Sequence, residues 1–190
     1  KKKQDENTKF NPRSAYGISK LAGYHLTKNY REAYGIFACS GILYNHESPR
    51  RNKNFVTRKI TYNLAKIHRN KKHKIFLGNI NSKRDWGHAK DYVVAMWKML
   101  QQNKPQDFVI GTGKLHSVKD FLKIAFGYFG LDYRKFIIID KKFYRKNDKY
   151  ILRANINKAT KILKWKPKIN FKSLVNEMVI NDINLVYKQS

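Results

Sequence analysis

The sequence lacks several features that would place a protein in one of the common special classes. It contains a single cysteine, Cys39, which excludes an internal disulfide framework and a cysteine-rich zinc site. Its longest apolar runs, such as FIIID at 136–140, have the length of a strand and are far short of a membrane span. The first residues, KKKQDENTK, resemble neither a signal peptide nor a transit sequence. We therefore expect a soluble, cytoplasmic protein.

Acidic residues are also scarce, with 13 Asp and Glu against 41 Lys and Arg, which leaves a formal net charge of +28. Such a surplus is typical of proteins that bind nucleic acid, because cations displace the counterions of phosphates. A second explanation has equal standing. Lys, Asn, Ile, Tyr and Phe account for 90 residues, all are encoded largely by AT-rich codons, and lysines occur along the whole chain. Charge alone leaves both explanations open.

A glycine-rich nucleotide-binding turn is a third absence. An α/β protein that binds a dinucleotide normally has such a turn between its first strand and its first helix. The one candidate is GTGKLH at 111–116, which lacks the third glycine. The chain also begins with lysine, and its first clear element is a helix. We therefore expect it to begin within a larger fold.

What is present is an alternation of strand-like and helix-like segments, which predicts an α/β fold. Ser14 is a suitable N-cap and Gly35 a suitable stop for a helix between them. An apolar run at 36–44 predicts a buried strand. Further strands are expected at 74–79, 107–113 and 135–140, and further helices at 55–68, 88–102, 117–130, 157–163 and 173–186.

Apolar residues at helical spacing support the helix expected at 88–102. The residues on one side of it are Val93, Met96, Trp97 and Leu100. The tryptophans are assigned to packing rather than to base stacking, and these are Trp86, Trp97 and Trp165.

A Tyr-x-x-x-Lys spacing occurs three times, as Tyr16/Lys20, Tyr24/Lys28 and Tyr62/Lys66. This is roughly the number expected by chance from the abundance of the two residues, so the spacing alone carries no weight. Residues four apart lie above one another on a helix, which can bring an ammonium close to a phenol. A nearby cation favours the phenolate and so makes a phenol a better base. The surroundings of each pair must decide whether it is catalytic.

Four stretches decide it. They lie at 11–35, 41–60, 77–93 and 141–168, and they include the distinctive strings NHESPRR and RDWGHAKD. In that order they resemble the GDP-mannose 4,6-dehydratase family of extended short-chain dehydrogenases. The likeness runs from about Lys9 to the C-terminus. It implies an incomplete Rossmann-type fold with a C-terminal substrate domain. Residues 1–44 would end the dinucleotide-binding domain, and 45–190 would form mostly the GDP-sugar domain, with some elements returning to the first.

The resemblance implies a reaction and two catalytic residues. In the family, GDP-mannose is oxidised at C4 by NADP, loses water across C5 and C6, and receives the hydride back at C6. The product, GDP-4-keto-6-deoxy-mannose, leads to GDP-fucose and related deoxysugars. Tyr16 and Lys20 match the catalytic pair, with Tyr16 as the base at the C4 hydroxyl and both residues touching the cofactor. The family's glutamate base lies upstream, and neither Glu6 nor Thr8 replaces the upstream residues.

Further binding residues are implied by the same match. His46 and Arg51 correspond to residues that contact NADP, in a loop that reaches a neighbouring subunit of a tetramer. No second histidine or carboxylate at ligand spacing from His46 suggests a metal. The residues that match the GDP-sugar site are Asn45, Lys59, Arg84, Arg145 and Asp148. The family usually has glutamate at the last of these, and Lys146, Ala154 and Ile156 also depart from its pattern.

The resemblance implies that about the first two fifths of the enzyme, with the NADP loop, is missing, so we expect this chain to be inactive alone. Two alternatives stay open. One is another nucleotide-sugar dehydratase or epimerase of the same superfamily, against which the NHESPRR and RDWGHAKD strings argue. The other is a basic RNA-binding module, for which no RNA-recognition motif is visible. We expect no nucleic-acid partner and no membrane association.

Overall fold

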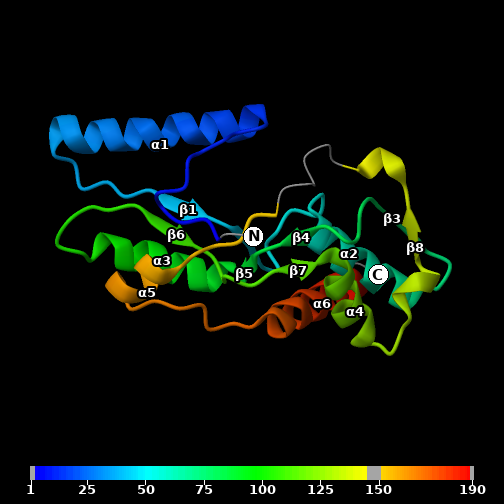
Figure 1. Ribbon diagram of the computed structural model, residues 1–190. Helices are drawn as coiled ribbons and strands as arrows, with labels where there is room; N and C mark the ends of the chain where they lie inside the picture. The colour runs from blue at the N-terminus through cyan, green and yellow to red at the C-terminus, as the bar shows by residue number, and fades with distance from the viewer. Residues whose placement is uncertain (1–2, 145–150, 189–190) are drawn as a thin grey trace.

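The structure is a computed structural model that describes residues 3–144 and 151–188. Helices and strands alternate along the chain, as predicted (Figure 1). The helices are α1 (Ala15–Tyr34), α2 (Val56–Arg69), α3 (Ala89–Leu100), α4 (Val118–Gly127), α5 (Asn157–Ile162) and α6 (Phe171–Lys188), with short 3-10 helices η1 (Tyr133–Lys135) and η2 (Lys141–Phe143). The strands are β1 (Gly41–Leu43), β2 (Asn45–Glu47), β3 (Ile75–Leu77), β4 (Lys83–Arg84), β5 (Trp86–His88), β6 (Phe108–Ile110), β7 (His116–Ser117) and β8 (Ile137–Ile139).

Local signals in the sequence begin and end the helices where predicted. The hydroxyl of Ser14 accepts a 3.0 Å hydrogen bond from the N–H of Gly17, which satisfies a donor of the first turn of α1. Gly35 ends the helix in the left-handed region at φ 64°, where a residue without Cβ carries no steric penalty. Ser117 and Asp120 form a reciprocal capping box at the start of α4.

Within the described residues, the strands form four short pairs. Three are parallel, β1 with β6, β2 with β5 and β3 with β8, and β4 pairs with β7 in the antiparallel sense. Helices connect the parallel strands, as an α/β fold requires. The buried strand expected at 36–44 is wrong in length and burial. Only 41–43 pair as a strand, and the side chains of Ile36 and Phe37 are exposed.

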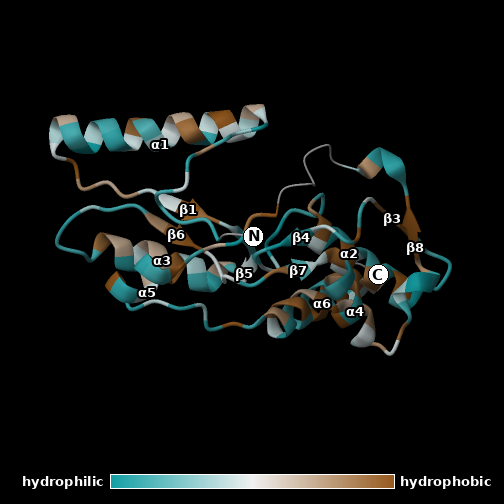
Figure 2. Ribbon diagram, viewed as in Figure 1, coloured by the Kyte–Doolittle hydropathy of each residue, from teal (hydrophilic) through white to brown (hydrophobic). Residues whose placement is uncertain are grey.

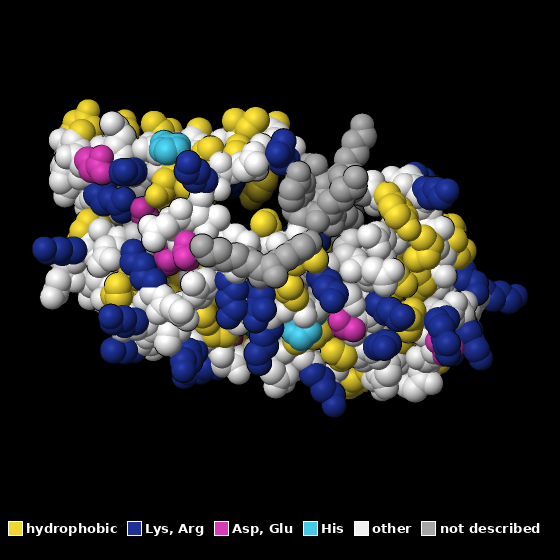
Figure 3. Space-filling view, in the orientation of Figure 1, with side chains coloured by type: hydrophobic (Ala, Val, Ile, Leu, Met, Phe, Trp, Pro, Cys, Tyr) yellow, Lys and Arg dark blue, Asp and Glu magenta, His cyan; other side chains and the backbone are white. Residues whose placement is uncertain are grey.

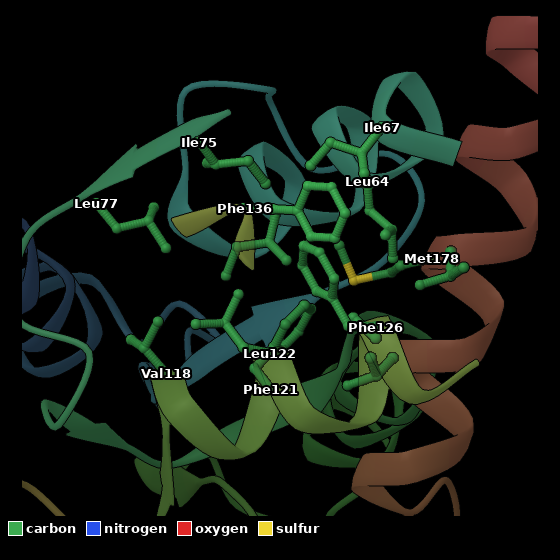
Figure 4. Close-up of a cluster of buried hydrophobic side chains, with 14 of the residues drawn as sticks. Leu64, Ile67, Ile75, Leu77, Val118, Phe121, Leu122, Phe126, Phe136 and Met178 are labelled. Carbon is green, nitrogen blue, oxygen red and sulfur yellow. The ribbon is translucent and has the colours of Figure 1, made fainter. Parts of the chain in front are cut away.

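The larger apolar core lies between α2, α4 and α6 and is closed at one side by β3 and Phe136. Figure 4 shows side chains from these elements converging on one another, among them Leu64, Phe126 and Met178. All three have no exposed surface. Burying a side chain of this size contributes about 1.5–3 kcal/mol relative to leaving it in water. This core fixes the elements that surround the candidate site described below.

A second core joins α3, β6 and α5. Tyr92 and Met99 on α3 pack there with Trp165, whose indole N–H donates a 2.9 Å hydrogen bond to the carbonyl of Asp91. Burial of Trp165 and of Trp86 confirms their packing roles. The packing role predicted for Trp97 is wrong, because its side chain is 61% exposed, and the other residues on that side of α3 are exposed too: Val93, Met96 and Leu100. The helix has two apolar faces, and β6 and α5 cover the other one.

The helix α1 stands apart from both cores. It lies along the upper edge of Figure 1, beyond β1 and β6, and none of its described residues is buried although it carries apolar side chains (Figure 2). A bidentate ion pair from Arg31 to Asp107, at 2.9 and 3.0 Å, ties its last turns to the chain just before β6. Neither α1 nor any other helix of the described chain is long and apolar enough to cross a membrane.

Candidate active site

The tyrosine–lysine pair of the first helix lies in the open. Tyr16 is in the first turn of α1, where the Ser14 cap starts the helix, and its side chain is 71% exposed. One helical turn later, the Lys20 ammonium lies 5.4 Å from the centre of the Tyr16 ring. The phenol is therefore accessible to another molecule and has a cation beside it. Tyr62 and Lys66 show a similar contact at 4.9 Å, so this geometry by itself does not distinguish a catalytic pair.

Asp107 anchors the end of α1 that lies farther from Tyr16. Its carboxylate accepts two hydrogen bonds from Arg31 and a 2.7 Å hydrogen bond from the N–H of Ser40. Burial acts to raise the pKa of Asp107, but the hydrogen bonds from Arg31 and Ser40 outweigh burial and lower it. The position of α1 relative to β6 thus rests on charge rather than on buried apolar surface.

A cavity of about 430 Å³ opens between β2, α2, the ends of β3 and β4, and η2. Four residues singled out from the sequence line it: Asn45, Arg51, Lys59 and Arg84. They come from β2, the loop after it, the second turn of α2 and β4. Three of these residues are cations, and Lys142 is a fourth cation in the lining. Glu47 is the one carboxylate among the described lining residues, so positive charge outweighs negative charge there. Such a lining is suited to an anionic ligand.

Three of the other sequence-predicted residues are not among the described residues that line this cavity: Tyr16, Lys20 and His46. Tyr16 and Lys20 are on α1, and His46 turns elsewhere on β2. The Nδ1 atom of His46 lies 3.0 Å from the carbonyl oxygen of Tyr44, and its ring packs 5.1 Å from that of Tyr92. Arg145 and Asp148 lie outside the described residues.

The loop that carries Arg51 is held in place by the guanidinium of Arg58. Arg58 donates hydrogen bonds to the carbonyl oxygens of Pro49 and Arg51. The Arg51 guanidinium lies over the Phe55 ring, with its carbon 3.6 Å from the ring centre. Its Nε approaches Glu47 to 3.2 Å without forming a hydrogen bond, so this contact is electrostatic. The loop therefore presents Arg51 to the cavity in one defined position.

Glu47 is a buried carboxylate in the cavity wall. Its side chain accepts a 2.6 Å hydrogen bond from the hydroxyl of Thr57, in the first turn of α2. Burial raises the pKa of Glu47, and this outweighs the lowering by Thr57, Arg51 and His46. A group with this environment tends to hold its proton longer than an ordinary glutamate.

Asp85 fixes the backbone next to Arg84. Its buried carboxylate accepts hydrogen bonds from the N–H groups of Thr112, Gly113 and Ala154, at 2.8, 2.8 and 3.1 Å. This explains the GTG sequence at 111–113, which the sequence analysis set aside as an incomplete nucleotide-binding turn. Its N–H groups bind a carboxylate of the same chain. Asp85 thereby links β4, the GTG turn and the segment that follows residue 150.

A comparison with known protein families identifies the family of this chain. A model described as GDP-mannose 4,6 dehydratase matches residues 1–178. The chain belongs to the GDP-mannose 4,6-dehydratase family. GDP-mannose 4,6 dehydratase 1 of Arabidopsis thaliana is 52% identical over 98% of this chain and 52% of its own length. The human GDP-mannose 4,6 dehydratase is 46% identical over 96% of this chain and 54% of its own length. The chain thus spans about half the length of the curated relatives it matches.

Solved structures show the fold of this GDP-mannose 4,6-dehydratase family member. RMD from Pseudomonas aeruginosa, complexed with NADPH, superposes with a TM-score of 0.86 at 17% identity, over 96% of this chain and 60% of that one. UDP-glucuronic acid 4-epimerase from Bacillus cereus, in complex with UDP-glucuronic acid and NAD, gives 0.85 at 17% identity, over 97% and 57%. The predicted extended short-chain dehydrogenase fold of the Rossmann type is confirmed.

Two residues of this GDP-mannose 4,6-dehydratase family member's cavity escaped the sequence analysis. Glu47 stands inside the NHESPRR string, where its neighbours were singled out and it was not. Lys142 lies in a basic segment in which no single lysine stands out. The string itself could have pointed to Glu47, because an acidic residue in an otherwise cationic loop indicates a specific partner or role. No local signal marks Lys142.

Proposed function

We propose that this chain forms the sugar-nucleotide-binding part of an NADP-dependent GDP-mannose 4,6-dehydratase, together with its tyrosine–lysine helix. This hydro-lyase converts GDP-mannose to GDP-4-keto-6-deoxy-mannose and water. Membership in the family supports the reaction. The observation that carries the proposal is the cationic cavity. Three residues expected at the GDP-sugar site line it, Asn45, Lys59 and Arg84, together with Arg51, which was expected to contact NADP.

The cavity suits a nucleoside diphosphate sugar because its lining is cationic and offers hydrogen-bond donors for phosphate and hydroxyl groups. Arg84 is proposed to bind the diphosphate, because a guanidinium presents paired N–H groups to phosphate oxygens. Lys59 adds a point charge from α2, and Asn45 offers an amide to sugar hydroxyls. Arg145 and Asp148 keep their proposed substrate roles, although they lie outside the described residues.

Tyr16 is proposed to take the proton of the C4 hydroxyl, with the Lys20 ammonium supplying positive charge beside the phenol as that proton moves. Both side chains are exposed on α1, which leaves them accessible to a cofactor ribose. His46 and Arg51 are the other residues proposed to contact NADP. NADP, when bound, accepts hydride from C4 and returns it to C6. The GTG turn is not proposed as its phosphate cradle, since Asp85 occupies those N–H groups.

The domain division is part of the same proposal. Residues 1–44 are assigned to the dinucleotide-binding domain and 45–190 mostly to the GDP-sugar domain. The second core supports the expectation that some later elements return to the first domain, because α3, α5 and β6 share it with Leu43 of β1. A homotetramer and a cytoplasmic location complete the proposal, and sedimentation of the purified protein tests the former.

Titration calorimetry with GDP, UDP and dTDP tests the substrate class. We expect GDP to bind more tightly than UDP or dTDP, and Lys59→Gln or Arg84→Gln to weaken GDP binding by about tenfold each, the effect of losing one charge-assisted contact. Equal binding of the three nucleotides would favour another sugar-nucleotide enzyme of the superfamily.

Two further experiments separate the remaining possibilities. In any preparation that turns over GDP-mannose, Tyr16→Phe should lower kcat by about a hundredfold or more, while Tyr62→Phe should leave it unchanged. Lys and Arg side chains lie over much of the face seen in Figure 3, without gathering into one stripe. RNA binding that falls steeply with salt, in a protein that binds no GDP, would favour the basic RNA-binding module instead.

A further inference from the structure

Two lysines from distant parts of the chain meet at the cavity. Lys59 is on α2 and Lys142 is on η2, and both line the cavity. Both ammonium groups lie near the Phe143 ring, whose centre is 4.2 Å from the Lys59 ammonium and 5.3 Å from that of Lys142. We call these two residues the Lys59–Lys142 pair. Two ammonium groups gathered around one ring present two positive charges to the same space.

The two ammonium groups repel each other. Burial lowers the pKa of Lys59, and the charge of Lys142 lowers it further. The Lys59 ammonium donates one 2.7 Å hydrogen bond to the carbonyl oxygen of Phe76, which does not neutralise it. An anion placed between the two ammonium groups would remove their repulsion.

The simpler account is that Lys142 is an ordinary surface lysine. Its side chain is 69% exposed, and its ammonium lies 3.0 Å from the carboxylate of Asp140. Exposed ion pairs of this kind contribute little to stability. The Lys142 ammonium can therefore bind a phosphate in addition to Asp140 or in its place. If Lys142 were only a solvated surface lysine, its backbone would not need to be fixed at one position.

The backbone beneath Lys142 is nevertheless fixed. The N–H of Asp140 donates a 2.8 Å hydrogen bond to the carbonyl of Leu77, at the end of β3. The carbonyl oxygen of Phe143 packs so closely on Gly78 that a Cβ at that glycine would lie 2.4 Å away. The short helix η2 is therefore seated against the end of β3, and this contact holds Lys142 beside the cavity. The position of Lys142 beside the cavity therefore depends on these contacts with Leu77 and Gly78, and no local sequence pattern indicates it.

We propose that Lys142 is a further substrate-binding residue, and that the Lys59–Lys142 pair clamps the diphosphate of the sugar nucleotide between its two ammonium groups. The inference rests on the proposed function, since it names an additional residue of the same site. A diphosphate suits the pair because each of its phosphates carries a negative charge, one for each ammonium.

Lys141 offers a matched control, because it is on the same short helix, is exposed and does not line the cavity. Lys142→Gln and Lys141→Gln are compared by calorimetric titration of the purified chain with GDP, inorganic pyrophosphate and guanosine. We expect Lys142→Gln to weaken GDP and pyrophosphate binding by about tenfold and to leave guanosine binding unchanged. Lys141→Gln should match the wild type with all three ligands.

A second measurement needs no ligand. In Lys142→Gln, the pKa of Lys59, followed by NMR of its side chain, should rise because a neighbouring positive charge has gone. The same resonance should titrate as in the wild type in Lys141→Gln. Circular dichroism of both variants checks that they fold alike.

The outcomes separate the inference from the function on which it rests. If Lys142→Gln binds GDP as Lys141→Gln does, the clamp is overturned, while weaker GDP binding in Arg84→Gln would keep the proposed function. Weakening of guanosine by the same factor as GDP would also overturn it, because the residue would then be structural. If the wild type binds neither GDP nor pyrophosphate, the proposed function and the clamp fall together.

Discussion

The guanidinium of Arg58 lies 2.7 Å from the carboxylate of Asp182, and both side chains are buried. The hydroxyl of Thr61 donates a further 2.6 Å hydrogen bond to the same carboxylate. Charge therefore joins α2 to α6 beside an apolar core. Arg58 also binds the carbonyl oxygens of Pro49 and Arg51, so one guanidinium supports both the core and the loop at the cavity.

Removal of this carboxylate should be costly. Asp182→Ala leaves a buried guanidinium and a buried hydroxyl without their partner, and we expect the free energy of unfolding to fall by about 3–5 kcal/mol. Asn184→Ala, at an exposed position of the same helix, should change it by less than about 0.5 kcal/mol. Urea unfolding followed by circular dichroism measures both. A loss below about 1 kcal/mol for Asp182→Ala would mean that Arg58 finds another partner.

Gly78 should tolerate no side chain. Gly78→Ala would place Cβ 2.4 Å from the carbonyl oxygen of Phe143, and backbone atoms cannot swing aside as a flexible side chain does. We expect a loss of about 1–3 kcal/mol in the free energy of unfolding. Gly23→Ala in α1 meets nothing within 4 Å and should instead stabilise by up to about 1 kcal/mol. Thermal melts of the two variants that shift in the same direction would contradict this account.

Glu47 should make stability depend on pH. Burial raises the pKa of Glu47 above that of a glutamate in the unfolded chain, which is about 4.3. The folded state therefore binds the proton more tightly, and this contribution is present below pH 4.3 or so and is lost as pH rises through the raised pKa. Glu47→Gln cannot titrate, so its stability relative to the wild type should increase over that interval.

Unfolding free energies of Glu47→Gln and wild type, measured in urea over about pH 4 to 8, test this prediction. Carboxylates with lowered pKa, such as Asp107 and Asp120, act in the opposite direction but equally in both proteins, so they cancel in the difference. A difference that stays constant across the series would show that burial does not hold the proton on Glu47.

Asp85 should be needed to hold the GTG turn. Asp85→Ala leaves the N–H groups of Thr112, Gly113 and Ala154 without their acceptor, and each buried unsatisfied donor costs about 1–3 kcal/mol. We expect a loss of more than about 2 kcal/mol and faster amide hydrogen exchange at Gly113 and Ala154. Glu32→Ala, which removes an exposed carboxylate of α1, should change neither. Unchanged exchange at both amides in Asp85→Ala would refute the role given to it.

Much of the candidate site was visible in the sequence because the family strings are contiguous. NHESPRR and RDWGHAKD pointed to Asn45, Arg51 and Arg84, and the structure lays all three on one cavity. Their binding roles stay predictions, as do the catalytic roles of Tyr16 and Lys20. Glu47 and Lys142 were not found, since the burial of the first and the cavity position of the second depend on α2 and β3, which are remote from them in the chain.

The sequence by itself determined the family, the α/β alternation and the ends of helices such as α1, because caps at Ser14 and Gly35 act through hydrogen bonds and backbone angles over a few residues. Only the tertiary structure decided which face of α3 is buried, since β6 and α5 cover Tyr92 rather than Trp97. It also decided that Lys59 and Lys142 share one cavity. Contacts between distant residues depend on how whole elements pack, and no local pattern encodes them.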